Sequence, residues 1–110
     1  MYWKEIKEKH PNAYSEFISW IVFNTTLLEY LDFNEDLEDI PFEIYLGCLI
    51  IFFEETGIKI HCDMHTYTTY ITIFDVRSET FHNGGTIKEC YDNAFAEAFY
   101  ILDNSKKINP

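Results

Sequence analysis

Residues 52–64 read Phe-Phe-Glu-Glu-Thr-Gly-Ile-Lys-Ile-His-Cys-Asp-Met, and the change of pattern within them decides the fold. Up to Gly57 the apolar residues recur at the spacing of a helix face, and beyond Gly57 they alternate with polar residues. A period of about 3.6 residues is typical of an amphipathic helix, whereas alternation is typical of a strand with one buried face. The chain is therefore predicted to pass from helix to strand at Gly57, which suits a helix C-terminus.

Three helices are predicted before this boundary. A short helical turn is expected over residues 2–9, and it is broken at His10 because a residue before proline avoids the α region. A second helix begins at Pro11, because the fixed φ of proline suits the first helical position. A third helix begins at Pro41, although its apolar run over residues 46–53 is also compatible with a buried strand.

A small sheet and a closing helix are predicted after the boundary. The expected strands span residues 58–65, 67–76 and 77–82. Residues 86–89, Thr-Ile-Lys-Glu, match a capping box at the start of a helix that continues to about Asn104. N-terminal helices, a three-stranded antiparallel meander and a C-terminal helix, with one sheet face covered, make a two-layer α+β fold. We expect residues 1–110 to form one acidic domain.

The composition is that of an acidic protein with a large core. The chain carries a formal net charge of −11, and 47% of its residues are hydrophobic. Disordered acidic chains are poor in aromatic residues, whereas this chain has 10 Phe, 8 Tyr and 2 Trp and is expected to fold. Direct contact with nucleic acid or an anionic membrane is not expected, since both need clustered Lys and Arg. The chain shows neither a signal-peptide pattern nor an apolar run of bilayer length, so we expect a cytoplasmic protein.

Carboxylates are concentrated in one part of the chain. Between residues 10 and 58 there are ten Asp and Glu residues and no Lys or Arg. Like charges this close repel one another within a Debye length of about 8 Å, and selection removes that cost unless solubility or a cationic partner uses it. Residues 29–43, named here the acidic segment, are therefore predicted to bind a partner. The residues expected to do so are Glu29, Asp32, Glu35, Asp36, Glu38, Asp39 and Glu43.

The acidic segment partly matches a calcium loop. Asp32, Asn34, Asp36 and Glu43 occupy four liganding positions of an EF-hand. The sixth position, which normally needs glycine, is Leu37, and a β-carbon at that turn costs about 1–2 kcal/mol. A solvated acidic loop is the simpler interpretation, and calcium binding is a distant alternative.

No arrangement of residues typical of catalysis is present. Residues 61–65, His-Cys-Asp-Met-His, place two histidines on one face of a strand but roughly 13 Å apart, too far to share a zinc ion. Cys48, Cys62 and Cys90 lack C-x-x-C spacing and are expected to be reduced, mostly buried thiols. Acid and base candidates are numerous but show no organised spacing. We therefore expect no enzyme activity, catalytic residue, metal site or cofactor.

Aromatic residues exceed what the expected helix faces need. The surplus residues are Tyr2, Trp3, Trp20, Phe23, Tyr30 and Phe33. Either some of them lie at a partner or subunit interface rimmed by the acidic segment, or all of them complete the core.

Three segments carry a resemblance to a known group of proteins. They are residues 3–20 with Trp-Lys-Glu-Ile-Lys, His-Pro-Asn-Ala-Tyr and Phe-Ile-Ser-Trp, residues 52–58 around Phe-Phe-Glu, and residues 93–103, an Ala- and Phe-rich run ending in Ile-Leu-Asp. These segments resemble small uncharacterised proteins encoded by phages and prophages of bacteroidete bacteria. The acidic segment is not part of the shared pattern. The resemblance implies a mobile-element origin and a compact α+β fold, and it implies no activity.

Two functions are predicted from these observations. The first is a non-catalytic interaction protein of a mobile element, an acidic inhibitor that occupies a basic, nucleic-acid-binding site on a host or defence protein. In its sharpest form the acidic segment mimics nucleic acid. The alternative is a homo-oligomeric structural or accessory protein, a homodimer in its simplest form, whose charge keeps it soluble.

Overall fold

The structure contains the predicted passage from helix to strand at Gly57. It is a computed structural model that describes residues 1–23, 37, 40–73, 81–83 and 85–108. Helix α3 (Phe42–Glu55) is closed by a hydrogen bond from the Gly57 amide to the Glu54 carbonyl, and Gly57 has a φ of 93°. A residue with a β-carbon would be strained at this φ by about 1–2 kcal/mol. Strand β1 (Ile58–Asp63) follows immediately, so the alternative strand over residues 46–53 is wrong.

The other helices begin and end close to the predicted positions. They are α1 (Trp3–Lys9), α2 (Pro11–Phe23) and α4 (Ile87–Ile108). Helix α1 ends at Lys9, and its C-cap residue His10 directly precedes the proline that begins α2. At the start of α4, the Thr86 hydroxyl accepts a hydrogen bond from the Glu89 amide, as the capping box predicts. The Glu89 carboxylate accepts the amide of Gly85, one residue before the expected partner.

The sheet is antiparallel and small. Strand β1 pairs with β2 (Thr68–Ile73), with Ile58 opposite Ile73. A short strand β3 (Phe81–Asn83) pairs with β2, which gives the order β1-β2-β3. Most of the strand predicted over residues 77–82 lies outside the described residues. The α+β class of the fold is confirmed.

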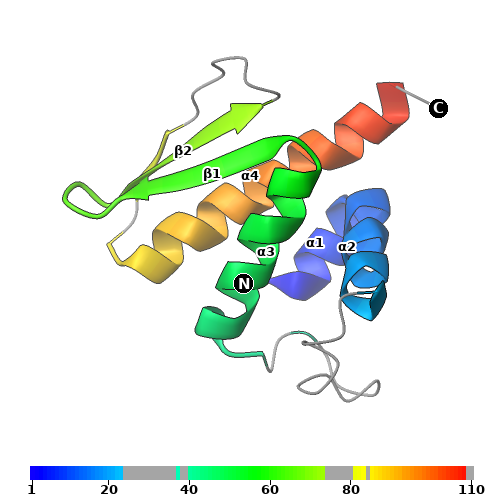
Figure 1. Ribbon diagram of the computed structural model, residues 1–110, viewed down its shortest axis with the longest axis horizontal. Coiled ribbons are helices and arrows are strands. Elements are labelled where there is room, and N and C mark those ends of the chain that lie inside the picture. Colours follow the sequence, from blue (N-terminus) through cyan, green and yellow to red (C-terminus); the bar gives the residue numbers. More distant parts are fainter. Residues whose placement is uncertain (24–36, 38–39, 74–80, 84, 109–110) are drawn as a thin grey trace.

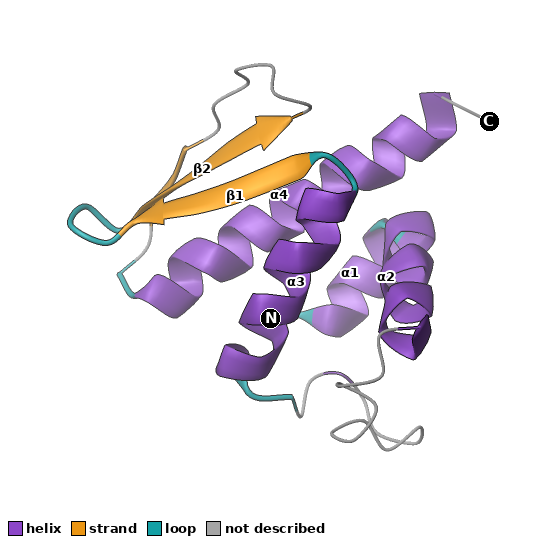
Figure 2. Ribbon diagram, in the orientation of Figure 1, coloured by secondary structure: helices purple, strands orange, loops and turns teal. Residues whose placement is uncertain are grey.

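Helices α3 and α4 lie between the sheet and the first two helices. Figure 1 shows α4 running behind the sheet, with α3 beside it in front. In Figure 2 the helices α1 and α2 lie on the side of α3 and α4 that is away from the sheet. This arrangement leaves one side of α3 facing outward, between the sheet and α2 (Figure 1).

Aromatic rings from all four helices meet in the core. Trp3 stacks on Phe17 with ring centroids 5.7 Å apart, and Phe17 lies 5.0 Å from Phe52. Phe53 meets Phe99 edge to face at 5.0 Å. Such pairs contribute about 0.5–1.5 kcal/mol each beyond their burial. For Trp3, the prediction that the surplus aromatic residues complete the core is therefore correct.

Two polar contacts set the positions of α2 and α3 against α4. The buried carboxylate of Asp103 accepts the backbone amides of Asn12 and Ala13, each at 3.0 Å, and so caps the N-terminus of α2 from α4. The Tyr45 hydroxyl of α3 donates to the Asp92 carboxylate of α4 at 2.6 Å. Burial and this carboxylate raise the pKa of the Tyr45 phenol, so it stays a neutral donor. These contacts determine which side of α3 faces outward.

Candidate partner-binding site

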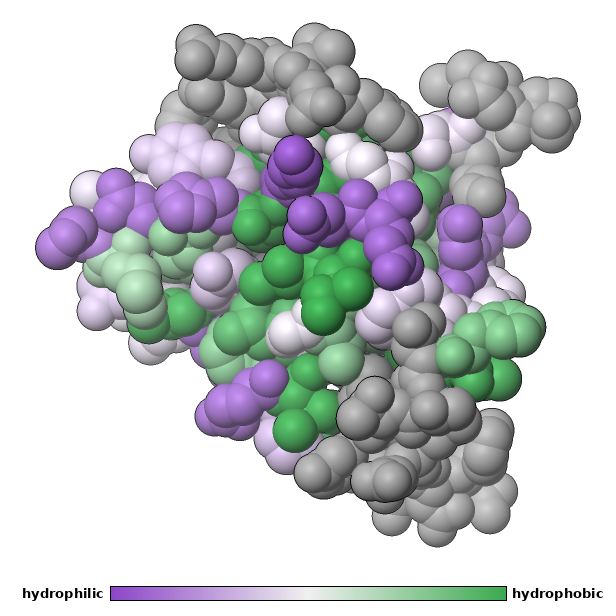
Figure 3. Space-filling view, viewed as in Figure 1, coloured by the Kyte–Doolittle hydropathy of each residue, from purple (hydrophilic) through white to green (hydrophobic). Residues whose placement is uncertain are grey.

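Helix α3 is apolar on both its inner and its outer side. Its inner residues, Tyr45, Leu49, Phe52 and Phe53, are buried in the core. Its outer residues are spaced at i, i+3, i+4 and i+7 and therefore share one face. We name this face the outer stripe, and it consists of Ile44, Gly47, Cys48 and Ile51. Ile51, the last residue of the stripe, keeps 53% of its surface exposed, whereas Ile44 and Cys48 are half-buried. Figure 3 shows the apolar area that results over α3.

Gly47 lies in the outer stripe without a structural need for glycine. A β-carbon added at Gly47 would meet nothing within 4 Å. Glycine inside a helix costs about 1 kcal/mol relative to alanine. The packing of the described residues thus gives no reason for this cost, whereas a glycine on an exposed helix face allows another backbone to approach closely.

Cys48 adds an uncharged surface to the outer stripe. Its side chain is half-buried, and burial raises the pKa of its thiol. The thiol is therefore neutral at physiological pH and behaves as a small apolar group. Cys62 and Cys90 are buried and free, so the prediction of reduced, mostly buried thiols is confirmed.

Carboxylates stand at both ends of the outer stripe. Glu43 lies in the first turn of α3, and Glu54 and Glu55 lie in its last turn, which contains no basic residue. All three side chains are exposed. Carboxylates stabilise the first turn of a helix but oppose the macrodipole in the last turn, where each costs about 0.3–1 kcal/mol. Glu54 and Glu55 are thus placed against the stability of the helix that carries them.

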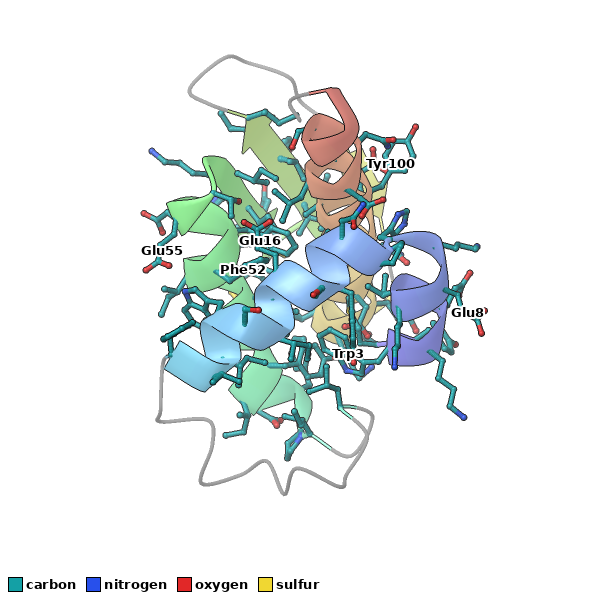
Figure 4. The ribbon with its side chains drawn as sticks, turned by 90° about the vertical axis from the view of Figure 1, so that its right-hand side faces the viewer. Trp3, Glu8, Glu16, Phe52, Glu55 and Tyr100 are labelled. Carbon is teal, nitrogen blue, oxygen red and sulfur yellow. The ribbon has the colours of Figure 1, made fainter. Side chains whose placement is uncertain are left out.

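A groove between α2 and α3 adjoins the outer stripe. It encloses ≈ 320 Å³. We name it the Trp20 groove, and it is lined by Glu16, Ser19, Trp20, Phe23, Phe52, Glu55 and Thr56. The indole N–H of Trp20 donates a hydrogen bond to the Glu55 carboxylate across the groove. In Figure 4, Glu16 and Phe52 lie between the two helices and Glu55 lies on the outer side of α3. Phe23, at the end of α2, is 84% exposed.

The structure describes only part of the predicted binding residues. Glu43 is exposed at the start of α3. The other six predicted carboxylates, Glu29, Asp32, Glu35, Asp36, Glu38 and Asp39, lie outside the described residues, as does most of the predicted calcium loop. Leu37, which belongs to the same segment, is buried in the core. Of the surplus aromatic residues, Trp20 and Phe23 line the groove, and Tyr30 and Phe33 are not described.

Within the described ranges, no three His, Cys, Asp or Glu side chains are grouped so that they could hold a metal ion. His61 is exposed on β1, but the strand ends at Asp63 and His65 lies in the following turn. The Asp63 carboxylate accepts the His65 amide at 2.9 Å, a side-chain contact that favours a turn over a longer strand. The strand predicted to reach His65 is thus two residues too long.

Sequence reasoning missed the outer stripe. The helical spacing predicts one apolar face, and the structure buries most of it in the core but leaves Phe42 and Leu46 half-buried. The predicted face consists of Phe42, Tyr45, Leu46, Leu49, Phe52 and Phe53. The signal that remained was a second set of apolar residues on the opposite side, Ile44, Cys48 and Ile51. The face of a surface helix that points away from the core is usually polar, so this second apolar set is unusual.

Comparison of the chain with protein-family models, curated proteins and solved structures found no match. None of the helices in the described part of the chain has the length and apolar character needed to span a membrane.

Proposed function

We propose that this protein is a non-catalytic interaction module that binds a basic, partly apolar segment of another protein. The carrying observation is the outer stripe of α3, in which Ile51 is exposed and Ile44 and Cys48 are half-buried, with Glu43 at one end and Glu54 and Glu55 at the other. Apolar contacts would supply most of the binding free energy, and the carboxylates would select a partner with Lys or Arg at matching positions.

Charge supports a foreign partner over a second copy of the chain. An antiparallel pairing of two α3 helices would bring Glu43 of one copy near Glu54 and Glu55 of the other. Like charges brought together in an interface weaken it. The homo-oligomeric accessory protein remains the second candidate, because the apolar stripe and Gly47 also suit helix pairing between copies. Light scattering separates the two, since the first candidate predicts a monomer at all concentrations.

The acidic segment extends the same proposal. Six of its seven carboxylates precede α3 in the chain, so they add negative charge to the part of the chain that leads to Glu43. Such a field steers a basic partner and makes binding sensitive to salt. In the sharpest form, the carboxylates take the place of phosphates in the nucleic-acid site of a host or defence protein, and the gene belongs to a mobile element.

Affinity capture from bacterial lysate, washed at low and then high salt, tests the proposal. Ile51→Asp and the double variant Glu54→Lys/Glu55→Lys are expected to lose a basic partner that the parent protein retains at low salt. Glu8→Lys is the matched control, because Glu8 is exposed on α1, on the opposite side of Figure 4 from Glu55. Equal capture by all these variants would contradict the site.

Reversal of charge at Asp36, Glu38 and Asp39 tests the acidic segment separately. We expect a lower affinity and a shallower dependence of affinity on salt, because fewer charged contacts remain. An unchanged affinity and salt slope would show that the acidic segment only aids solubility.

A further inference from the structure

The Trp20 groove joins an aromatic surface to a carboxylate in a fixed geometry. The indole N–H of Trp20 donates to Glu55, and the indole ring lies 5.9 Å from the Phe52 ring and 6.2 Å from the Phe17 ring. Phe17 and Phe52 are core residues with 1% exposure each, so they give the indole a rigid support. The ring and the carboxylate are thereby held beside each other before any ligand arrives.

The Trp20 groove is lined by two carboxylate side chains and is therefore suited to a cationic ligand. Glu16 comes from α2 and Glu55 from α3, and neither helix contains a Lys or Arg residue. Glu55 accepts the indole N–H with one of the roughly four lone-pair sites of a carboxylate, which leaves room for further donors. As a last-turn residue, Glu55 also opposes the dipole of α3, and a bound cation would offset that cost.

We propose that this groove binds one arginine side chain of the partner segment, with the guanidinium against the indole of Trp20 and hydrogen-bonded to Glu55. The inference rests on the proposed function and names the residue that anchors the partner. A guanidinium is planar, so it stacks on an aromatic ring while its edge donates two parallel hydrogen bonds to a carboxylate. Phe23, 84% exposed at the end of α2, supplies apolar surface for the methylene groups of the arginine.

The groove also lies where a segment on the outer stripe would reach it. Ile51 and Glu55 are four residues apart on α3 and therefore neighbours on its surface. A partner segment packed on Ile51 and Cys48 thus places a side chain at the groove without leaving the stripe. The arginine in the groove fixes the position of the partner segment along α3, and the outer stripe contacts the apolar side chains of that segment.

The two tryptophans make a direct test by NMR. Trp3 is buried in the core with 3% exposure, and Trp20 lines the groove, so the indole region of a ¹⁵N spectrum contains one control signal and one reporter signal. The probes are three blocked amphipathic peptides of Leu, Ala and Gln that differ only in one central residue: arginine, lysine or the neutral isostere citrulline. The Trp20→Phe variant assigns the reporter signal.

We expect the arginine peptide to shift the Trp20 indole signal and leave that of Trp3 in place. Its affinity should exceed that of the citrulline peptide by about two- to fivefold, the range of an exposed cation–aromatic contact, with lysine weaker than arginine. Glu55→Gln keeps an acceptor for the indole N–H but removes the negative charge, so it should narrow the difference in affinity between the arginine and citrulline peptides. Glu8→Gln is the matched control and should change nothing.

Three results would overturn the arginine anchor. They are a Trp20 signal that does not move, equal affinities for the arginine and citrulline peptides, and a lysine peptide that binds as well as arginine. If backbone signals of Gly47 and Ile51 still shift in these cases, the outer stripe binds its partner and the proposed function stands. If no signal of α3 moves with any peptide and capture is unaffected by Ile51→Asp, the proposed function fails as well.

Discussion

The two sides of helix α3 are both apolar, but only the inner side is fully buried. On the inner side Leu49 and Phe53 have no exposed surface, and on the outer side Ile51 keeps 53% exposed while Gly47 faces open space. Single exposed apolar residues are common on proteins, whereas a continuous stripe of them marks a contact surface. Apolar character therefore identifies residues suited to a contact, and the described fold does not cover the outer side of Ile51.

The largest expected effect is the difference in protein stability between substitutions on the inner and on the outer side of α3. Phe53→Ala should lower the free energy of unfolding by about 3–5 kcal/mol, because it leaves a cavity in a fully buried site. Ile51→Ala should change it by less than about 0.5 kcal/mol, as is usual for surface positions. Urea unfolding measures both. A loss for Ile51→Ala that approaches the loss for Phe53→Ala would mean that the outer stripe belongs to the core.

The next effect concerns the helix that forms the other wall of the groove. Asp103→Ala should lower the free energy of unfolding by about 1–3 kcal/mol, because the amides of Asn12 and Ala13 lose their acceptor. Asn104→Ala is the control at the next position, where the side chain is half-buried, and should cost less than about 0.5 kcal/mol. If both variants lower the free energy of unfolding by the same amount, Asp103 does not stabilise the protein by capping α2.

A smaller effect of opposite sign is expected at the outer stripe. Gly47→Ala should raise the free energy of unfolding by about 0.5–1 kcal/mol, since alanine favours the helix and its methyl group meets no atom. Gly57→Ala should lower it by about 1–2 kcal/mol, because the φ of 93° disfavours a β-carbon. Thermal and urea unfolding of both variants check the signs. A destabilised Gly47→Ala protein would show that other parts of the chain already cover the outer stripe.

The smallest effect is on thiol chemistry and leaves stability unchanged. Cys48 should react with iodoacetamide slowly at neutral pH, because burial raises the pKa of its thiol and the thiolate is the reactive form. The rate of alkylation of Cys48 should continue to rise at pH values above the ordinary pKa of a cysteine thiol. Binding of the arginine peptide should slow this alkylation. Cys62 and Cys90, which are buried, should react only after unfolding. Mass spectrometry follows the alkylation of each cysteine. Equal rates for all three would contradict the difference in exposure between half-buried Cys48 and the two buried cysteines.

Local signals in the sequence predicted much of the fold. Pro11, Gly57 and Thr86 act through their own backbone or through neighbours within a few residues, so each marks a helix boundary that is visible in the sequence alone. Gly57 in particular identified both the end of α3 and the start of β1.

The site could not be predicted in the same way, because it depends on which helix faces meet. The groove forms where Trp20 of α2 comes to lie beside Glu55 of α3, 35 residues further along the chain. Asp103 caps a helix that begins about ninety residues earlier, and the sequence shows it only as the last residue of an Ile-Leu-Asp run. The acidic segment was visible by composition alone, and charge density gives a class of partner but no geometry.

A paired measurement on Gly47→Gln tests whether the outer stripe binds the partner. The free energy of unfolding and the capture of the partner are determined on the same preparation. Glutamine favours a helix more than glycine, and its side chain would stand in the middle of the outer stripe. We expect a protein that is more stable by about 0.5 kcal/mol and no longer retains the basic partner. A less stable protein, or one that captures the partner as well as the parent protein does, would contradict this expectation.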